Sequence, residues 1–454
     1  MTAGVLLPAA GPSQPTGRWG VELRRFLPLL PAVAVVALLA LPAHSAGDGT
    51  AGTGNAADAA SALLVLHCLI RAVRDRARPL TRTAAVILGL PVLGVSVAAI
   101  TAHDPAAALP GVARYLQIFV LVPAALLLLI RDRADFRLVA GSLVALALVQ
   151  GGIGVAQFLT GTGASYMGED IRAVGTFGPT DVMAMATVVA YGLVSAVGFA
   201  LGEDREISRA QRAAALVCAG LLSVPLALSF SRGTWIATAL AVAVQLAVSG
   251  LRRAGRAALV AGALGVVLVG GLGAGSQLIT ERLDSITQVT AAPDQSVTDR
   301  YTMWAAAADM WRTEPIDGVG LKGFPAFRDS HSSLALSAAS DTDGAGAGFQ
   351  RQPLLSPHNM YLLILSEQGL FGVLALAGSW AALLVCALRG LPRARRTRTG
   401  SDCAFVVAGL LVWQLTDFGY ADIGGPSTVL TAVVLGLAAW WALDRRATEG
   451  AATT

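Results

Sequence analysis

Long apolar runs recur along most of this 454-residue chain and constrain its fold more than any other feature. A helix needs about 20 mostly apolar residues to cross a hydrocarbon core ~30 Å thick. Hydrophobic residues make up 55% of the chain and charged residues only 14%, a balance foreign to soluble domains. We therefore predict twelve membrane-spanning helices, at 26–43, 55–70, 83–102, 113–130, 138–160, 180–201, 213–230, 233–250, 257–278, 370–388, 403–419 and 427–443.

The placement of basic residues orients these segments across the membrane. If the N-terminus is cytoplasmic, the inward-facing segments hold 24 of the 33 basic residues, and nine lie outside or at outer helix ends. This bias follows the positive-inside rule and places the loops 161–181 and 279–357 on the outer side. Residues 26–46 also resemble a cleavable signal peptide, because small residues precede a possible cleavage point at Ser45. The remaining topology is the same either way.

The predicted fold class is therefore an all-α polytopic membrane protein with a large outer loop between spans 9 and 10. Residues 1–278 form a membrane domain with spans 1–9. Residues 279–369 form the outer loop with short helices, and 370–454 add spans 10–12 and a cytoplasmic tail. Neither the four cysteines nor the scattered acidic residues show the spacing of a metal site, so we predict no metal or other cofactor. No nucleotide-binding fingerprint or nucleic-acid motif is present.

His358 is the candidate catalytic residue. It lies where the polar loop meets the next apolar segment, within reach of both water and lipid head groups. An imidazole titrates near neutrality and can therefore accept a proton from a hydroxyl group at ambient pH. Asn359 follows it directly, and Glu367 either orients the histidine or simply ends a helical turn before Gly369.

Three arginines on the predicted outer side are candidate ligands for an anion. Arg172 lies in the loop after the fifth span, and Arg232 lies in a tight turn between two apolar runs. Arg300 lies near the start of a helix that Thr298 is predicted to cap, one turn before Trp304. Arginine keeps its charge and grips phosphate oxygens with a planar fork, so a shared site would suit a phosphate or pyrophosphate.

These residues together resemble the O-antigen ligase and polymerase-type membrane proteins. The family signature is His, then Asn, Ser or Gln, nine residues, Gly, two residues, then Gly, Thr or Tyr. It is matched by His358-Asn359, Gly369 and Gly372. The remaining pieces occur in the expected order, namely Arg172 with Gly175-Thr176-Phe177, Ser231-Arg232-Gly233, Arg300 with Trp304, and Gly318-Val319-Gly320 with Phe324. Lys322 departs from the pattern, because many relatives carry a small residue before Gly323.

The resemblance implies a metal-independent glycosyltransferase with a GT-C-like fold in the cytoplasmic membrane of a bacterium. Its members move a glycan from undecaprenyl diphosphate to a lipid, a growing polysaccharide or a protein on the outer side. By this reading His358 is the base, and Arg172, Arg232 and Arg300 bind the diphosphate. Asn359, Glu367, Gly369 and Lys322 are supporting residues.

Two other classes of function remain open at this point. A transporter of a small anion could also use arginines beside the membrane, although transporters usually place charges near the midplane and have repeated halves. A non-catalytic assembly partner is the other alternative. Ligase and polymerase differ only in the acceptor, so the sequence does not separate them.

Overall fold

The computed structural model describes residues 25–42, 55–75, 80–166, 169–178, 181–250, 255, 295–333, 336, 340–344, 347–352 and 354–444. Helices dominate these residues: α2 Leu30–Ala37, α3 Ala56–Arg74, α4 Arg82–Ile100, α5 Pro105–Leu116, α6 Val122–Leu129, α7 Arg133–Thr160, α8 Val182–Leu201, α9 Arg209–Leu228, α10 Arg232–Ser249, α13 Gln295–Thr313, α14 Phe324–His331, α15 Met360–Thr397, α16 Ser401–Asp417 and α17 Val429–Leu443. A short π-helical stretch, η3 Gln117–Leu121, joins α5 to α6.

The helices confirm a polytopic membrane architecture. Within the described residues, eight helices are long and apolar enough to cross a membrane, and the apolar helices Leu27–Ala40 and Val429–Leu443 are shorter. Each predicted span that falls in the described part of the chain coincides with a helix. The ninth predicted span, 257–278, lies outside the described residues, so the total of twelve stays a prediction, as do the domain boundaries.

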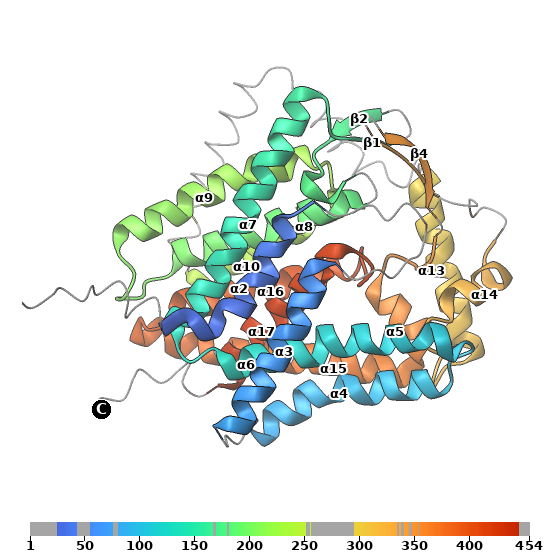
Figure 1. Ribbon diagram of the computed structural model, residues 1–454, viewed down its shortest axis with the longest axis horizontal. Coiled ribbons are helices and arrows are strands. Elements are labelled where there is room, and N and C mark those ends of the chain that lie inside the picture. Colours follow the sequence, from blue (N-terminus) through green and yellow to red (C-terminus); the bar gives the residue numbers. More distant parts are fainter. Residues whose placement is uncertain are drawn as a thin grey trace, which may run out of the picture.

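The helices α16 and α17 form the centre of the bundle (Figure 1). They pack against α6, α8, α10 and α15, and nearly every side chain along them is buried. The sequence of α17 is apolar on almost all sides, which is typical of a helix surrounded by other helices. In α16 the polar side chains of Asp402 and Gln414 are buried as well. The large rings of Trp413, Trp440 and Trp441 are at most 1% exposed and fill this core.

Peripheral helices expose apolar side chains instead. On α3, Leu63 and Leu69 are 62% and 59% exposed, and on α9 Leu216 and Val217 are similarly accessible. In water such surfaces would be unfavourable, whereas the acyl chains of a bilayer are an equally apolar solvent for them. These faces therefore mark the lipid-facing perimeter of the bundle.

A small antiparallel sheet departs from the predicted all-α fold. Its strands are β1 Ala164–Tyr166, β2 Glu169–Arg172, β3 Ser340–Gly344 and β4 Ala347–Gln352, in the order β2-β1-β3-β4. The central pairing aligns Ala164 with Gly344 and so joins the loop after α7 to the loop before α15 (Figure 1). Backbone hydrogen bonds thus connect two loops that the sequence analysis treated as separate.

Two helices also begin earlier than predicted. The helix carrying Arg300 begins at Gln295 rather than at Thr298. The helix containing the predicted span 370–388 begins at Met360 and passes through non-helical geometry at Gly369, with φ 61° and ψ −164°. A helical region therefore follows His358 almost at once, and a kink separates its first turns from the apolar remainder.

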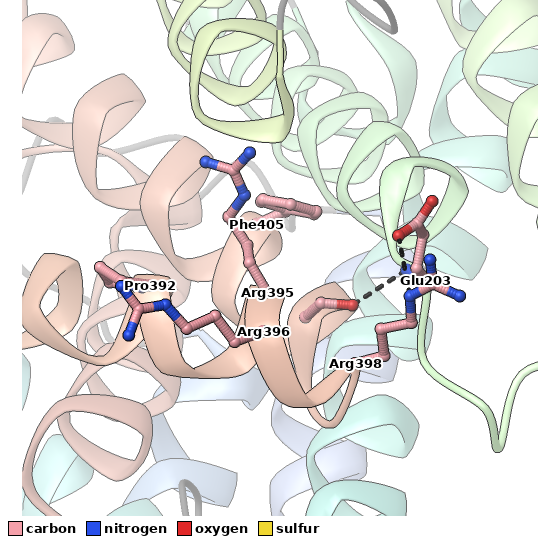
Figure 2. Close-up of a pocket in the computed structure, with 7 residues that line it drawn as sticks. Glu203, Pro392, Arg395, Arg396, Arg398 and Phe405 are labelled. Carbon is pink, nitrogen blue, oxygen red and sulfur yellow. Dashed lines mark hydrogen bonds and ion pairs between the residues drawn. The ribbon is translucent and has the colours of Figure 1, made fainter.

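The far end of α15 lies in an arginine-rich part of the molecule. Arg137 donates to Asp402 at 2.8 Å, to Asp204 at 2.9 Å and to Glu206 at 2.7 Å, which ties α7 to the loop after α8 and to the start of α16. A cavity of about 580 Å³ opens beside this network, lined by Glu203, Pro392, Arg395, Arg396, Arg398, Ser401 and Phe405. Figure 2 shows Arg398 reaching toward Glu203. This cavity is at the opposite end of α15 from His358.

Candidate active site

His358 occupies an unusual backbone conformation directly before α15. Its φ of 47° lies in the left-handed region, which a residue with a Cβ adopts only when its surroundings impose it. The constraint comes from Asn359, whose side chain caps α15 by accepting from the N–H of Leu362 at 3.1 Å. The same side chain donates to the carbonyl of Gly419 at 3.0 Å. The histidine is therefore fixed between a helix start and the segment after α16.

Asp422 is the carboxylate paired with His358. Its Oδ2 lies 3.9 Å from Nδ1 of the imidazole, and the same oxygen accepts a hydrogen bond from the Ser356 hydroxyl. Oδ1 accepts from the N–H of Gly424 at 3.0 Å. The aspartate is 9% exposed and the histidine 45%, so the imidazole has an open side while the carboxylate is held from behind.

The surroundings of the imidazole favour its neutral form. Burial lowers the pKa of His358 below 6.5, the nearby charge of Asp422 opposes this shift, and the positive charge of Arg300 adds to it. A neutral imidazole is the form that accepts a proton. Once protonated, the ring would lie beside a carboxylate, which stabilises the imidazolium.

The helix α13 brings Arg300 and Trp304 to this histidine. The indole N–H of Trp304 donates to the carbonyl of Pro357 at 2.9 Å, which attaches α13 to the residue preceding His358. Tyr301 packs edge-on against Trp304, with ring centroids 5.6 Å apart. Arg300 also acts electrostatically on Asp417 at the end of α16. Its charge therefore influences both His358 and Asp417.

Arg232 begins α10 on a turn that abuts the same segment. Ser231 caps the helix, and its hydroxyl lies 2.8 Å from that of Thr234. A Cβ at Gly233 would lie 3.3 Å from the side chain of Tyr420, so the turn packs closely on the segment between Asp417 and Asp422. The Ser-Arg-Gly motif therefore places the first turn of α10, at Gly233, against the loop that carries Asp422.

Arg172 is the last residue of β2, and the segment that follows it is bonded to α9 and α7. The N–H of Ala173 donates to the carbonyl of Leu228, 3.2 Å away at the end of α9. Gln157 on α7 accepts from the N–H groups of Val174 and Gly175 at 3.1 and 2.8 Å. The segment after Arg172 is thereby clamped onto α7. Convergence of Arg172, Arg232 and Arg300 on one anion stays a prediction.

The remaining supporting residues meet at a glycine-rich turn. The N–H of Val319 donates to the carbonyl of Ser366 at 2.8 Å, and that of Phe324 to Glu367 Oε1 at 3.3 Å. Lys322 has a positive φ of 62°, and its charge acts on Glu367. Glu367 therefore faces this turn, and the charge of Asp422 also acts on it.

Asp422 is the residue that sequence reasoning missed. It lies more than sixty residues after His358, outside the histidine motif, in a short stretch between two apolar runs. The available signal was the pair Asp417 and Asp422, because carboxylates so close to spanning helices need partners. Among the described residues, no group of three His, Cys, Asp or Glu side chains is arranged to share a metal ion.

Part of the chain that carries this site matches a known protein family. No curated protein matches the chain. Residues 214–377 match the family model described as O-antigen ligase. The match begins in α9 and ends in α15, so it includes Arg232, Arg300 and His358, whereas Arg172 and Asp422 lie outside it. The resemblance expected from the motifs is confirmed, and this chain is a bacterial membrane protein in which residues 214–377 match the O-antigen ligase family.

Proposed function

We propose that this protein transfers a glycan from undecaprenyl diphosphate to an acceptor on the outer face of the cytoplasmic membrane, with inversion at the anomeric carbon and without a divalent metal. Its family acts in cell-envelope polysaccharide biosynthesis. The observation that carries the proposal is the pairing of His358 with Asp422, 3.9 Å from its Nδ1, directly before α15, with the charge of Arg300 also acting on the imidazole. Acceptors of this class are a lipid, a growing polysaccharide or a protein.

In the proposed reaction, His358 takes the proton from an acceptor hydroxyl as its oxygen attacks the anomeric carbon. The new carbon–oxygen bond forms while the bond between that carbon and the diphosphate oxygen breaks, so the electron pair leaves with undecaprenyl diphosphate. A single displacement inverts the configuration. Asp422 stabilises the imidazolium that results, and general-base assistance of this kind contributes ~10²–10⁴-fold to a rate.

The leaving diphosphate needs positive charge that is already in place. Charge develops on its bridging oxygen in the transition state, so fixed cations there stabilise the transition state more than the ground state. Arg300 is close enough to His358 to change its pKa. Arg232 begins a helix whose first turn packs on Tyr420, and Arg172 ends a strand whose next residue is bonded to the end of α9. We assign all three to the diphosphate.

Purified protein in proteoliposomes tests this function directly. With a glycan-linked undecaprenyl diphosphate donor and a hydroxyl acceptor, we expect glycosylated acceptor and free undecaprenyl diphosphate in equal amounts. Turnover is expected to be the same in EDTA as in added Mg²⁺ or Mn²⁺. Activity lost in EDTA and restored by either ion would overturn the arginine-based mechanism, and donor consumed without product would overturn the transferase.

A further inference from the structure

A second ion pair lies next to the site, outside the motifs that identify the family. Asp58 stands in the first turn of α3, where its side chain accepts from the N–H of Asn55 at 3.1 Å and completes a capping box. Oδ1 of Asp58 also accepts from Arg114 on α5. The two side chains are 19% and 23% exposed. Asp58 lies in the first turn of its apolar helix, and Arg114 lies within the apolar span Pro105–Leu129.

The pair is part of a larger set of hydrogen bonds. Nη1 of Arg114 donates to Gln117 Oε1 at 3.0 Å, and Nε2 of Gln117 donates to Asp58 at 3.1 Å and to Ser61 at 2.7 Å. Gln117 is the first residue of the π-helical stretch η3. Such π-bulges interrupt an α-helix at a cost and are frequent at functional sites. Here the bulge begins at the residue that joins Arg114 to Asp58.

One branch of this network reaches the loop that carries Asp422. Nη2 of Arg114 donates to the carbonyl of Gly425 at 3.4 Å. The opposite side of Gly425 is closed, because a Cβ there would lie 2.5 Å from the carboxylate of Asp181. Gly424, one residue earlier, donates to Asp422 at 3.0 Å. The turn is thus held between α5 and the start of α8, directly after the partner of His358.

We infer that Arg114 and Asp58 are positioning residues for Asp422, and through it for His358, an inference that rests on the proposed function. Asp58 holds the planar guanidinium of Arg114 through Nη1, and Nη2 of the same group holds the turn 422–425. A lysine at 114 would keep the charge opposite Asp58 but would lose the planar fork that reaches Asp58 and Gly425 together. The Arg114→Lys variant therefore separates the ion pair with Asp58, which it keeps, from the positioning of the turn at Gly425, which it loses.

The test compares Arg114→Lys, Arg114→Ala, Asp422→Asn and the double variant Arg114→Lys/Asp422→Asn in proteoliposomes. The charged groups acting on His358 are Asp422 and Arg300, and Asp417 is in turn affected by both. If Asp422 moves away, the imidazole loses its acidic partner, so its pKa falls and the acid limb of the kcat profile moves to lower pH. We expect this shift in both Arg114 variants and in Asp422→Asn.

We further expect kcat to fall roughly 10-fold in Arg114→Lys, a part of the ~10²–10⁴-fold that a general base supplies. The double variant should be no slower than Asp422→Asn alone, because the two residues act through one path. Arg25→Ala, which removes an exposed ion pair with Asp132, is the matched control and should keep the wild-type profile.

Two outcomes would overturn the inference: a wild-type kcat and pH profile in Arg114→Lys, or losses that multiply in the double variant. Arg114→Lys keeps the ion pair, so it remains informative if Arg114→Ala fails to insert. His358→Ala separates this result from the proposed function. An inactive His358→Ala with a normal Arg114→Lys removes only the positioning role. An active His358→Ala removes His358 as the base, and donor consumed without product removes the proposed function itself.

Discussion

The backbone at His358 is strained, and strain of this kind costs roughly 1–3 kcal/mol that the surrounding structure must offset. The offset comes from both neighbours of His358, since Trp304 donates to Pro357 and Asn359 donates to Gly419, and from Asp422, which pairs with the imidazole. A strained residue held so firmly, with its side chain 45% exposed, is suited to meeting a substrate. The strained backbone and the exposed imidazole thus agree with the proposed role of His358 as the base.

Replacing His358 by alanine should remove transfer while leaving membrane insertion intact, because the side chain fills no part of the helical core. Loss of a general base predicts a rate fall of ~10²–10⁴-fold. The measurement is product formation by purified variant in proteoliposomes. His103→Ala, which removes an exposed histidine that packs against Phe327, is the control and should retain activity. A His358→Ala enzyme with more than about a tenth of the wild-type rate would show that His358 is not the base.

Lysine in place of Arg172, Arg232 or Arg300 should lower activity markedly, although the charge is kept. A lysine is a point charge and lacks the fork that binds two phosphate oxygens at once. Steady-state rates at saturating donor measure the effect. Arg312→Lys on the same helix as Arg300 is the control, since Arg312 is exposed and pairs with Asp309. Full activity in all three lysine variants would disprove bidentate binding of the diphosphate.

The sequence predicts some of these residues and not others for a physical reason. His358 and Arg300 lie within motifs whose spacing reflects local structure, so they are recognisable from the order of residues alone. Asp422, by contrast, reaches His358 only because α16 returns the chain to the start of α15. Contact between segments far apart in sequence is set by tertiary packing, and no local pattern reports it.

At the scale of the element, the kink in α15 explains a glycine of the family motif. Gly369 has a positive φ of 61°, and a Cβ there would lie 2.3 Å from the carbonyl of Ile316. The next residues donate to this segment, with Leu370 bonded to Pro315 at 2.9 Å and Phe371 to Ile316 at 3.1 Å. The glycine lets the outer turn dock against the break in the helix.

Gly369→Ala should therefore destabilise the protein by more than the ~1–3 kcal/mol of backbone strain alone, since it adds a clash with rigid backbone. Lower abundance in membranes and a lower unfolding temperature in detergent measure this effect. Gly378→Ala lies on the same helix with nothing within 4 Å of the added methyl group, and it should be neutral or slightly stabilising. Equal stability of the two variants would contradict the docking role.

Helices follow from the sequence more readily than the sheet. Apolar runs such as the one in α8 have the length and composition of a span, which local residues fully determine. The strand β1 is three residues long and pairs with β3 from a loop well over a hundred residues away. Strands this short have no periodicity to detect, so the all-α prediction omitted them.

At the scale of the whole molecule, the two ends of α15 differ in chemistry. Its first residues lie beside His358, Asp422 and Arg300. Its last residues enter the arginine-rich end, where Arg395, Arg396 and Arg398 line a cavity with Glu203 (Figure 2). An excess of arginine in short loops favours retention in the cytoplasm. The two ends are therefore expected on opposite sides of the membrane, with the candidate site outward.

Labelling of single cysteines in intact spheroplasts tests this orientation. The background variant replaces Cys68, Cys218, Cys386 and Cys403 by alanine, and cysteine is then introduced at Thr162 or at Thr397, both of which are exposed. We expect a membrane-impermeant maleimide to label Thr162→Cys in intact spheroplasts, because that residue follows α7 at the same end as the sheet. Thr397→Cys should react only after permeabilisation, because it ends α15 among the arginines. The reverse pattern would place His358 in the cytoplasm, where a glycan displayed on the outer surface could not be its substrate.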